Sequence, residues 1–242
     1  MTQRIALDNV TVAYHHQIAL QGVNFSLPPG VVVGLVGMNG SGKSTLLKTI
    51  MGFIRPKTGR VWIEGLPVAV AQKRGWLAYL PQSEQVDWRF PVTVQDVVMM
   101  GRYGYMNAWR VPRAIDWRIV QASLQQVDMW ELRHRPIGEL SGGQKKRAFL
   151  ARALAQQAPI LLLDEPFNGV DGPTEQAMRQ LLLELRGQGH TILVATHDLK
   201  TVAAFCDQVI LINKTVLAYG ATPEVVTPEN LHRVFGVYPL EV

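Results

Sequence analysis

The sequence predicts an α/β fold with a mostly parallel sheet, an antiparallel β subdomain at the N-terminus and an inserted helical subdomain. Three observations support this. Short continuous apolar runs, such as VVVGLVG and ILLLD, are typical of strands that are buried on both faces of a sheet. Helix-like stretches alternate with these runs, which favours a parallel sheet covered by helices. Between about residues 91 and 155 the chain instead shows helix-like segments rich in Gln, Arg and Trp, which we interpret as a lobe inserted into the sheet's chain path.

Each element follows from its own pattern. The opening segments IALDNVTVAY and VNFSL alternate weakly, as antiparallel strands with one solvent-facing side do. PPG at residues 28–30 predicts a turn into VVVGLVG, and a helix is expected from Gly42 to Gly52. The next segment, GRVWIEG, is predicted to form a strand. After residue 155 the expected order is ILLLDE, a helix over 174–186, TILVATHD, another helix and QVILINKTVLAYG.

Length and composition narrow the class of protein. The 242 residues suffice for one large domain with an inserted lobe, and we expect a single domain over residues 1–242. A hydrophobic content of 48% argues against disorder, and the apolar runs are too short to cross a bilayer. The opening residues do not read as a signal peptide, and Cys206 is the only cysteine, so we expect a reducing compartment. The formal charge of +5 suits nucleotides, nucleic acids or an anionic membrane face without choosing among them.

A phosphate-binding loop follows the apolar run VVVGLVG. The segment GMNGSGKST matches the pattern G-x-x-x-x-G-K-[ST], with a predicted strand before it and a helix after it. Glycines let successive backbone N–H groups face phosphates, and the helix dipole adds to the attraction. We expect Lys43 to reach the β- and γ-phosphates and the Ser44 hydroxyl to bind Mg²⁺, which makes this a P-loop nucleoside triphosphatase core. The candidate nucleotide-binding residues of the loop are Gly37, Asn39, Gly40, Gly42, Lys43, Ser44 and Thr45.

Two acidic residues end the apolar run ILLLDE. Ligand sites of parallel sheets lie beyond the carboxyl ends of the strands, so Asp164 and Glu165 should face the same crevice as the phosphate loop. We expect Asp164 to hold Mg²⁺, through water, and Glu165 to polarise the attacking water. His197 closes the next such run, ILVATHD, and is expected to contact the γ-phosphate.

A second glycine turn lies in GELSGGQKKRAFLARALA. Ser141 can cap the following helix, while Gly142 and Gly143 expose backbone N–H groups at its positive end. The basic residues after the turn, at 145–147, are expected to form a solvated face. The sequence therefore carries two separate anion-binding turns.

Four segments in this order, GMNGSGKST, LSGGQ, LLLDEP and ATHD, resemble the ATPase subunits of ATP-binding cassette (ABC) transporters. The likeness extends over essentially the whole chain. It implies an enzyme that binds ATP and Mg²⁺ and acts as a homodimer. In such a head-to-tail dimer, the turn at residues 141–144 of one subunit closes over the nucleotide that the other subunit holds.

The resemblance also assigns residues one at a time. It places Tyr14 against adenine, Gln82 of YLPQ near Mg²⁺ and water, and Asp171 in the loop after the acidic strand. That loop reads FNGVD where TSALD or similar is common, so its detailed contacts can differ from the family pattern. The implied sets are Glu165, His197 and Gln82 for catalysis, Ser44, Gln82 and Asp164 for the metal, and Ser141, Gly142, Gly143 and Gln144 for the nucleotide of the other subunit.

Two further segments, VDWRFPVTVQDVVMMGRYGYM and TPENLHRVFG, resemble cassettes that serve manganese, zinc or iron importers. The implied partners are separate membrane permease subunits and an extracytoplasmic metal-binding protein, with the ATPase on the cytoplasmic face of the inner membrane. One group of side chains is expected either to grip a permease helix or to pack the helical lobe. These residues are Trp88, Phe90, Met99, Met100, Tyr103 and Tyr105.

Other functions remain open on the sequence alone. The chain resembles cassettes of metal-chelate importers (siderophore, haem or cobalamin) in its C-terminal segment, and the basic pI permits an ABC-type ATPase that acts on DNA or ribosomes. The single cassette, without sustained heptads or a cysteine cluster, disfavours the latter, so no nucleic acid partner is expected. A non-catalytic module conflicts with the intact Lys43, Asp164, Glu165 and His197.

Overall fold

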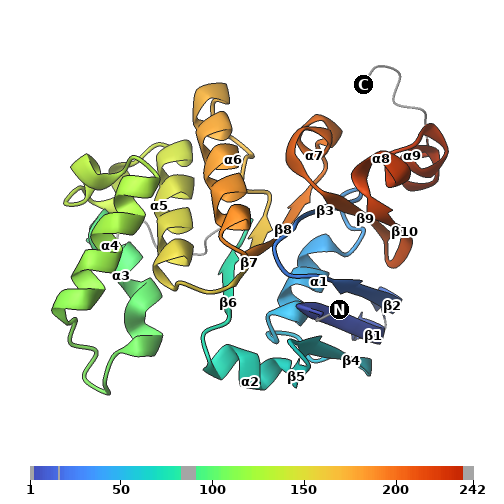
Figure 1. Cartoon of the computed structure of the whole chain (residues 1–242), viewed down its shortest axis with the longest axis horizontal. Coiled ribbons are helices and arrows are strands. Elements are labelled where there is room, and N and C mark those ends of the chain that lie inside the picture. The colour runs from blue at the N-terminus through green and yellow to red at the C-terminus, as the bar shows by residue number, and fades with distance from the viewer. Residues whose placement is uncertain (1–2, 16, 83–90, 237–242) are drawn as a thin grey trace. The chain divides into compact units, whose positions relative to one another are not determined.

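The structure is a computed structural model that describes residues 3–15, 17–82 and 91–236 (Figure 1). The chain divides into two compact units. We call the first, residues 1–82, 159–166 and 182–242, the core unit, and the second, residues 83–158 and 167–181, the helical unit.

The core unit begins with an antiparallel sheet, as predicted from the weak alternation of the opening residues. Its four strands lie in the order β2-β1-β4-β5. Buried and exposed side chains alternate over much of β1, because one face packs on the core and the other faces solvent. The strands are β1 (Ile5–Tyr14), β2 (Gln17–Leu27), β4 (Thr58–Ile63) and β5 (Leu66–Pro67).

The second sheet of the core unit has six strands in the order β10-β9-β3-β8-β7-β6, and it carries the candidate site. All pairs are parallel except β9 with β10, which form a hairpin. β3, β7 and β8 are buried at every position, which confirms the prediction from their continuous apolar runs. The strands are β3 (Val32–Val36), β6 (Leu77–Leu80), β7 (Ile160–Asp164), β8 (Thr191–Thr196), β9 (Gln208–Asn213) and β10 (Thr215–Ala221).

Helices cover both faces of the six-stranded sheet. α1 lies between the two sheets, where its Leu46, Leu47 and Ile50 join one hydrophobic core with side chains of both. α7 packs on the other face of β3: a Cβ on Gly34 would lie 3.1 Å from Val202 Cγ1, so the close approach needs a glycine. The helices of the core unit are α1 (Lys43–Ile50), α2 (Val68–Lys73), α7 (Leu199–Phe205), α8 (Thr222–Val225) and α9 (Pro228–Phe235).

The helical unit is built on α3, α4 and α5, which pack against one another (Figure 1). The lobe predicted over residues 91–155 lies within it, but the unit also includes residues 167–181, which are the loop after β7 and the first part of α6. The helical pattern of 174–186 carries no sign of this division, because one amphipathic helix runs through it. The elements are α3 (Val94–Met99), η1 (Met100–Tyr105), α4 (Ala114–Gln126), η2 (Trp130–Leu132), η3 (Ile137–Glu139), α5 (Gly142–Ala155) and α6 (Gly172–Gly187).

No helix of the described residues combines the length and the apolar character that crossing a membrane requires.

Candidate nucleotide site

The phosphate loop joins β3 to α1, and its glycines are required by the geometry. A Cβ on Gly37 would lie 2.3 Å from the carbonyl oxygen of Ile212 and 2.5 Å from Ser41 Oγ. Gly42 has φ of 102°, and a Cβ there would lie 2.8 Å from the carbonyl oxygen of Ala19. The loop can therefore curl this tightly only with these residues, which is the condition for presenting backbone N–H groups to a phosphate.

Lys43 is the first residue of α1 and is buried. Its Nζ donates hydrogen bonds to the carbonyl oxygens of Gly37, at 2.7 Å, and Met38, at 3.2 Å. Burial lowers the pKa of Lys43, while the nearby carboxylates of Glu165 and Asp164 act in the opposite direction. The ammonium group thus lies across the loop, at the positive end of α1, where phosphate charge would be bound.

Asp164 ends β7 almost completely buried. Burial raises the pKa of its carboxyl group, and hydrogen bonds from Ser44 and Tyr79 partly oppose the rise. The Tyr79 hydroxyl donates to Oδ2 at 3.4 Å, whereas Oδ1 is buried with no hydrogen-bond partner among the described residues. A buried carboxylate oxygen in this state calls for a ligand, and an oxygen donor set of carboxylate and hydroxyl suits Mg²⁺.

The described residues contain no cluster of three or more His, Cys, Asp and Glu side chains that would hold a metal ion alone. Mg²⁺ keeps several water molecules and takes one or two protein carboxylates together with substrate phosphates, and Asp164 with the Ser44 hydroxyl offers such a donor set. Asp164 and Ser44 therefore fit this ion.

Glu165 follows β7 in an unusual backbone conformation. Its φ is 51°, which is uncommon for a residue other than glycine, and its N–H donates to the carbonyl oxygen of Ala195 in β8 at 2.9 Å. The side chain is buried, and its Oε1 lies 3.0 Å from Nδ1 of the exposed His197. The turn after β7 thus directs the Glu165 carboxylate toward His197, the residue that follows β8.

A cavity of about 290 Å³ brings most of these groups together. Gln82 lines it as well, and so do Ala19 and Met38, which we did not predict from the sequence. Tyr14 is exposed at 47%, and its hydroxyl lies 3.5 Å from Thr45 Oγ1 at the start of α1. The predicted residues that line the cavity are Asn39, Gly40, Gly42, Lys43, Ser44, Thr45, Gln82, Asp164 and Glu165.

The second glycine turn lies in the helical unit, where Ser141 is the N-cap of α5 as expected. Its Oγ accepts a hydrogen bond from the Gln144 N–H at 3.3 Å, and Gln144 Oε1 accepts one from the Ser141 N–H at 3.0 Å. Ser141 and Gly142 are exposed. The N–H groups of Gly142 and Gly143 belong to the first turn of α5, where helix geometry supplies no acceptor, so the turn can bind an anion from another molecule.

Asp171 lies in the same unit as this turn. Its carboxylate accepts hydrogen bonds from the N–H and the hydroxyl of Thr174, both at 3.0 Å, and these bonds lower its pKa. The preceding residues approach the turn: a Cβ on Gly143 would lie 3.8 Å from the carbonyl oxygen of Gly169. Asp171 therefore shapes the start of α6 beside the glycine turn.

Some of the expected surface residues have internal roles. Arg147 is only partly solvated, because it donates to the carbonyl oxygens of Val127 and Asp128. Met99 is buried, and the Tyr105 hydroxyl donates to the carbonyl oxygen of Gln156 at 2.6 Å. Packing thus accounts for Met99, whereas Met100 and Tyr105 remain exposed and Tyr103 is partly exposed; Trp88 and Phe90 lie outside the described residues.

The fold and the site together define a P-loop ATPase. The sheet places a glycine loop, a buried lysine and two carboxylates around one cavity at the carboxyl ends of its strands. A profile described as ABC transporter matches residues 20–168. The chain belongs to the ABC transporter family, as a component that binds and hydrolyses ATP.

Three curated relatives are similar over nearly the whole chain. The manganese transport system ATP-binding protein MntA of Synechocystis sp. is 57% identical, over 98% of this chain and 91% of its own length. The chelated iron transport system membrane protein YfeB of Yersinia pestis is 55% identical, over 96% and 79%. The zinc transport system ATP-binding protein TroB of Treponema pallidum is 44% identical, over 96% and 86%.

The fold is also similar to solved structures of this family. A nucleotide-free ATP-binding cassette from an ABC transporter superimposes with a TM-score of 0.82 at 25% sequence identity, and covers 98% of this chain and 96% of that one.

Proposed function

We propose that this chain is the ATP-hydrolysing subunit of an importer that takes up manganese, zinc or iron through separate permease subunits. The observation that carries the ATPase role is the cavity in which the phosphate loop faces Asp164 and Glu165. The transported metal is supported by the identity to relatives named for manganese, chelated iron and zinc transport. The name of the iron relative also makes a metal-chelate importer the second candidate.

In this proposal residues 1–242 act as one ABC ATPase domain, and the core unit binds ATP. The N–H groups of the phosphate loop and Lys43 bind the phosphates, and Tyr14, exposed above the start of α1, stacks on adenine. Gly37 contributes by letting the loop close. Asn39, Gly40 and Thr45 line the same cavity and complete the phosphate contacts.

Ser44, Gln82 and Asp164 are the residues that would hold Mg²⁺. When bound, the ion would neutralise phosphate charge and orient the γ-phosphate. Glu165 orients the attacking water and accepts its proton, and His197 contacts the γ-phosphate. The hydrogen bond between Glu165 and His197 couples these two roles.

The site is completed by a second copy of the chain. The turn of Ser141, Gly142, Gly143 and Gln144 closes over the nucleotide of the other subunit, with Asp171 in the adjacent loop. ATP joins two subunits, closure moves the permeases, and hydrolysis with product release reopens the pair. The assembly lies on the cytoplasmic face of the inner membrane and receives its metal from an extracytoplasmic binding protein.

Mixing two inactive variants tests the shared site. Lys43→Ala disables the phosphate loop and Ser141→Arg blocks the glycine turn, so each homodimer has two defective sites. A mixed dimer keeps one intact site, and random pairing should restore about a quarter of the wild-type ATPase rate. The measurement is phosphate release from the mixture.

A matched mixture controls this test. Lys43 and Glu165 serve the same site of the same subunit, so Lys43→Ala mixed with Glu165→Gln should stay inactive. If both mixtures are inactive, or if a monomeric preparation hydrolyses ATP at the full rate, the shared site is wrong.

Uptake of radioactive manganese, zinc and iron tests the transport role. Deletion of the gene should lower the uptake of one of these metals in the source cells, and the wild-type chain should restore it while Lys43→Ala does not. Permease subunits should copurify with the tagged chain from solubilised membranes. Copurification of nucleic acid or ribosomes, with normal uptake of all three metals, would instead support the DNA or ribosome ATPase.

A further inference from the structure

Residues 105–118, between η1 and the first turns of α4, expose several large apolar side chains that the nucleotide chemistry does not use. The exposed fraction is 86% for Trp109, 59% for Val111, 48% for Ile115 and 44% for Trp117. Single exposed apolar residues are common, but four large ones within nine residues of the sequence are an unusual concentration of exposed apolar side chains. Such a surface indicates a binding partner.

The exposed charges of the same segment are all positive. Arg110, Arg113 and Arg118 are exposed, and the only acidic residue, Asp116, is fully buried. Arg102 and Arg113 both bind its carboxylate, at 3.2 Å each. The surface therefore presents aromatic and basic groups with no acidic side chain among them.

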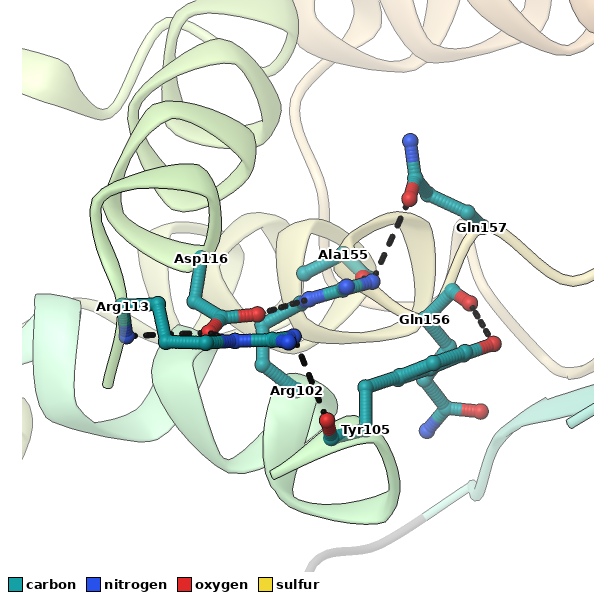
Figure 2. A network of polar contacts seen from close by, with 7 residues as sticks. All are labelled: Arg102, Tyr105, Arg113, Asp116, Ala155, Gln156 and Gln157. Carbon is teal, nitrogen blue, oxygen red and sulfur yellow. Dashed lines mark hydrogen bonds and ion pairs between the residues drawn. The ribbon is translucent and has the colours of Figure 1, made fainter. Parts of the chain in front are cut away.

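Hydrogen bonds and ion pairs hold the segment against η1 and α5, as Figure 2 shows. Arg102 donates to Asp116 and to the carbonyl oxygen of Ala155, so η1, α4 and the end of α5 share one polar network. Arg113 donates to the carbonyl oxygen of Tyr105 at 3.2 Å and thereby closes the base of the segment.

At the tip of the segment, a turn presents Trp109. The Asn107 carbonyl oxygen accepts from the Arg110 N–H at 2.9 Å, and Asn107 Oδ1 accepts from the Val111 N–H at 3.4 Å. Because these two hydrogen bonds define the backbone of the turn, binding through Trp109 needs little further ordering of the backbone.

We infer that residues 105–118 form a contact surface for the anionic phospholipid headgroups of a membrane. Indole rings partition to the boundary between headgroups and acyl chains, where their apolar body is buried and their N–H stays hydrated. Arginines near such a surface bind anionic lipid, and their affinity decreases as salt screens it. The segment exposes no acidic side chain, which suits this partner, because a negatively charged membrane would repel an exposed carboxylate.

Vesicle flotation of the full chain tests the inference without nucleotide or permease, so its result does not depend on the proposed transport function. The chain should float with vesicles of phosphatidylcholine and phosphatidylglycerol, and it should dissociate from them as the salt concentration is raised. With vesicles of phosphatidylcholine alone, it should stay in the bottom fraction. Arg118→Gln should weaken the binding about fivefold, since one arginine near the surface contributes roughly that factor. Trp109→Ala should weaken it as well.

Arg60→Gln is the matched control, because Arg60 is an exposed arginine of β4 in the core unit and the net charge changes equally. It should bind vesicles as the wild type does, and all three variants should keep the wild-type ATPase rate. Equal binding to both kinds of vesicle, or equal losses in Arg118→Gln and Arg60→Gln, would overturn the inference. Binding only to vesicles that contain permease would assign the surface to a protein partner and overturn it too.

Discussion

Replacement of Glu165 by Gln is expected to lower the rate of ATP hydrolysis by about 10²–10⁴-fold, the usual contribution of a positioned general base. The amide keeps the size of the side chain but cannot accept a proton from water. Nucleotide binding should be unchanged, because the phosphate loop and Lys43 remain intact and Glu165 lies at the end of β7, outside the loop. Phosphate release and nucleotide affinity, measured on the same preparation, separate the two effects.

The same variant should accumulate as an ATP-bound dimer, because the step that reopens the pair is blocked. Size-exclusion chromatography with and without ATP measures this. Glu229→Gln, the same change at an exposed position of α9, should hydrolyse ATP at the wild-type rate and not accumulate. Wild-type turnover of Glu165→Gln would show that another group activates the water.

Much of the core unit could be predicted from local sequence patterns because its constraints are local. A strand buried on both faces is predominantly apolar, and β3 with VVGLV and β7 with ILLL before Asp164 both fit this pattern. The phosphate loop is likewise recognised within nine residues, although the atoms that crowd Gly37 and Gly42 belong to Ile212 and Ala19, far away in the sequence. The cap of α5 follows from Ser141 and Gln144, three residues apart.

The remaining features depend on contacts between distant residues. Tyr79 was not predicted as a partner of Asp164, although it lies three residues before Gln82 in YLPQ, at the end of β6 next to β7. Nothing in the pattern of either segment sets their register. The backbone conformation of Glu165 also depends on its hydrogen bond to β8, some thirty residues further along the chain.

The buried ion pair of the helical unit is the clearest feature of this kind. Asp116 stands between the exposed Ile115 and Trp117 in the first turn of α4, and no sequence pattern singled it out. In the structure it is fully buried and binds Arg102 and Arg113 (Figure 2). The network joins η1, α4 and α5, so its loss should act on the whole helical unit.

Asp116→Asn is therefore expected to destabilise the protein by about 3–5 kcal/mol, the usual cost of leaving one buried charge without its counter-ion. Arg102 would stay buried with only neutral acceptors, the carbonyl oxygen of Ala155 and Gln157 Oε1. Urea unfolding followed by circular dichroism measures the change. This loss is large against the total stability of an ordinary domain, about 5–15 kcal/mol.

Two further variants show whether the buried charge is the cause. Glu139→Gln breaks the exposed pair of Glu139 with Arg135 and should cost less than about 1 kcal/mol. Arg102→Met combined with Asp116→Leu removes both charges and should recover most of the lost stability. A double variant as unstable as Asp116→Asn would indicate a packing effect instead.

The acid dependence of stability gives an independent measure of the same carboxylate. Burial by itself raises the pKa of Asp116, but hydrogen bonds from Arg113 and Arg102 outweigh it, so the pKa lies below the ordinary value of 3.8. With its folded pKa depressed, the carboxylate contributes its full stability above pH 3.8 and loses it as the pH falls through the folded pKa. The free energy of unfolding of the wild type should therefore decrease in that acidic window, and Asp116→Asn should lack this part of the decrease. Parallel pH profiles for the two proteins would mean that Asp116 does not hold its charge in the folded state.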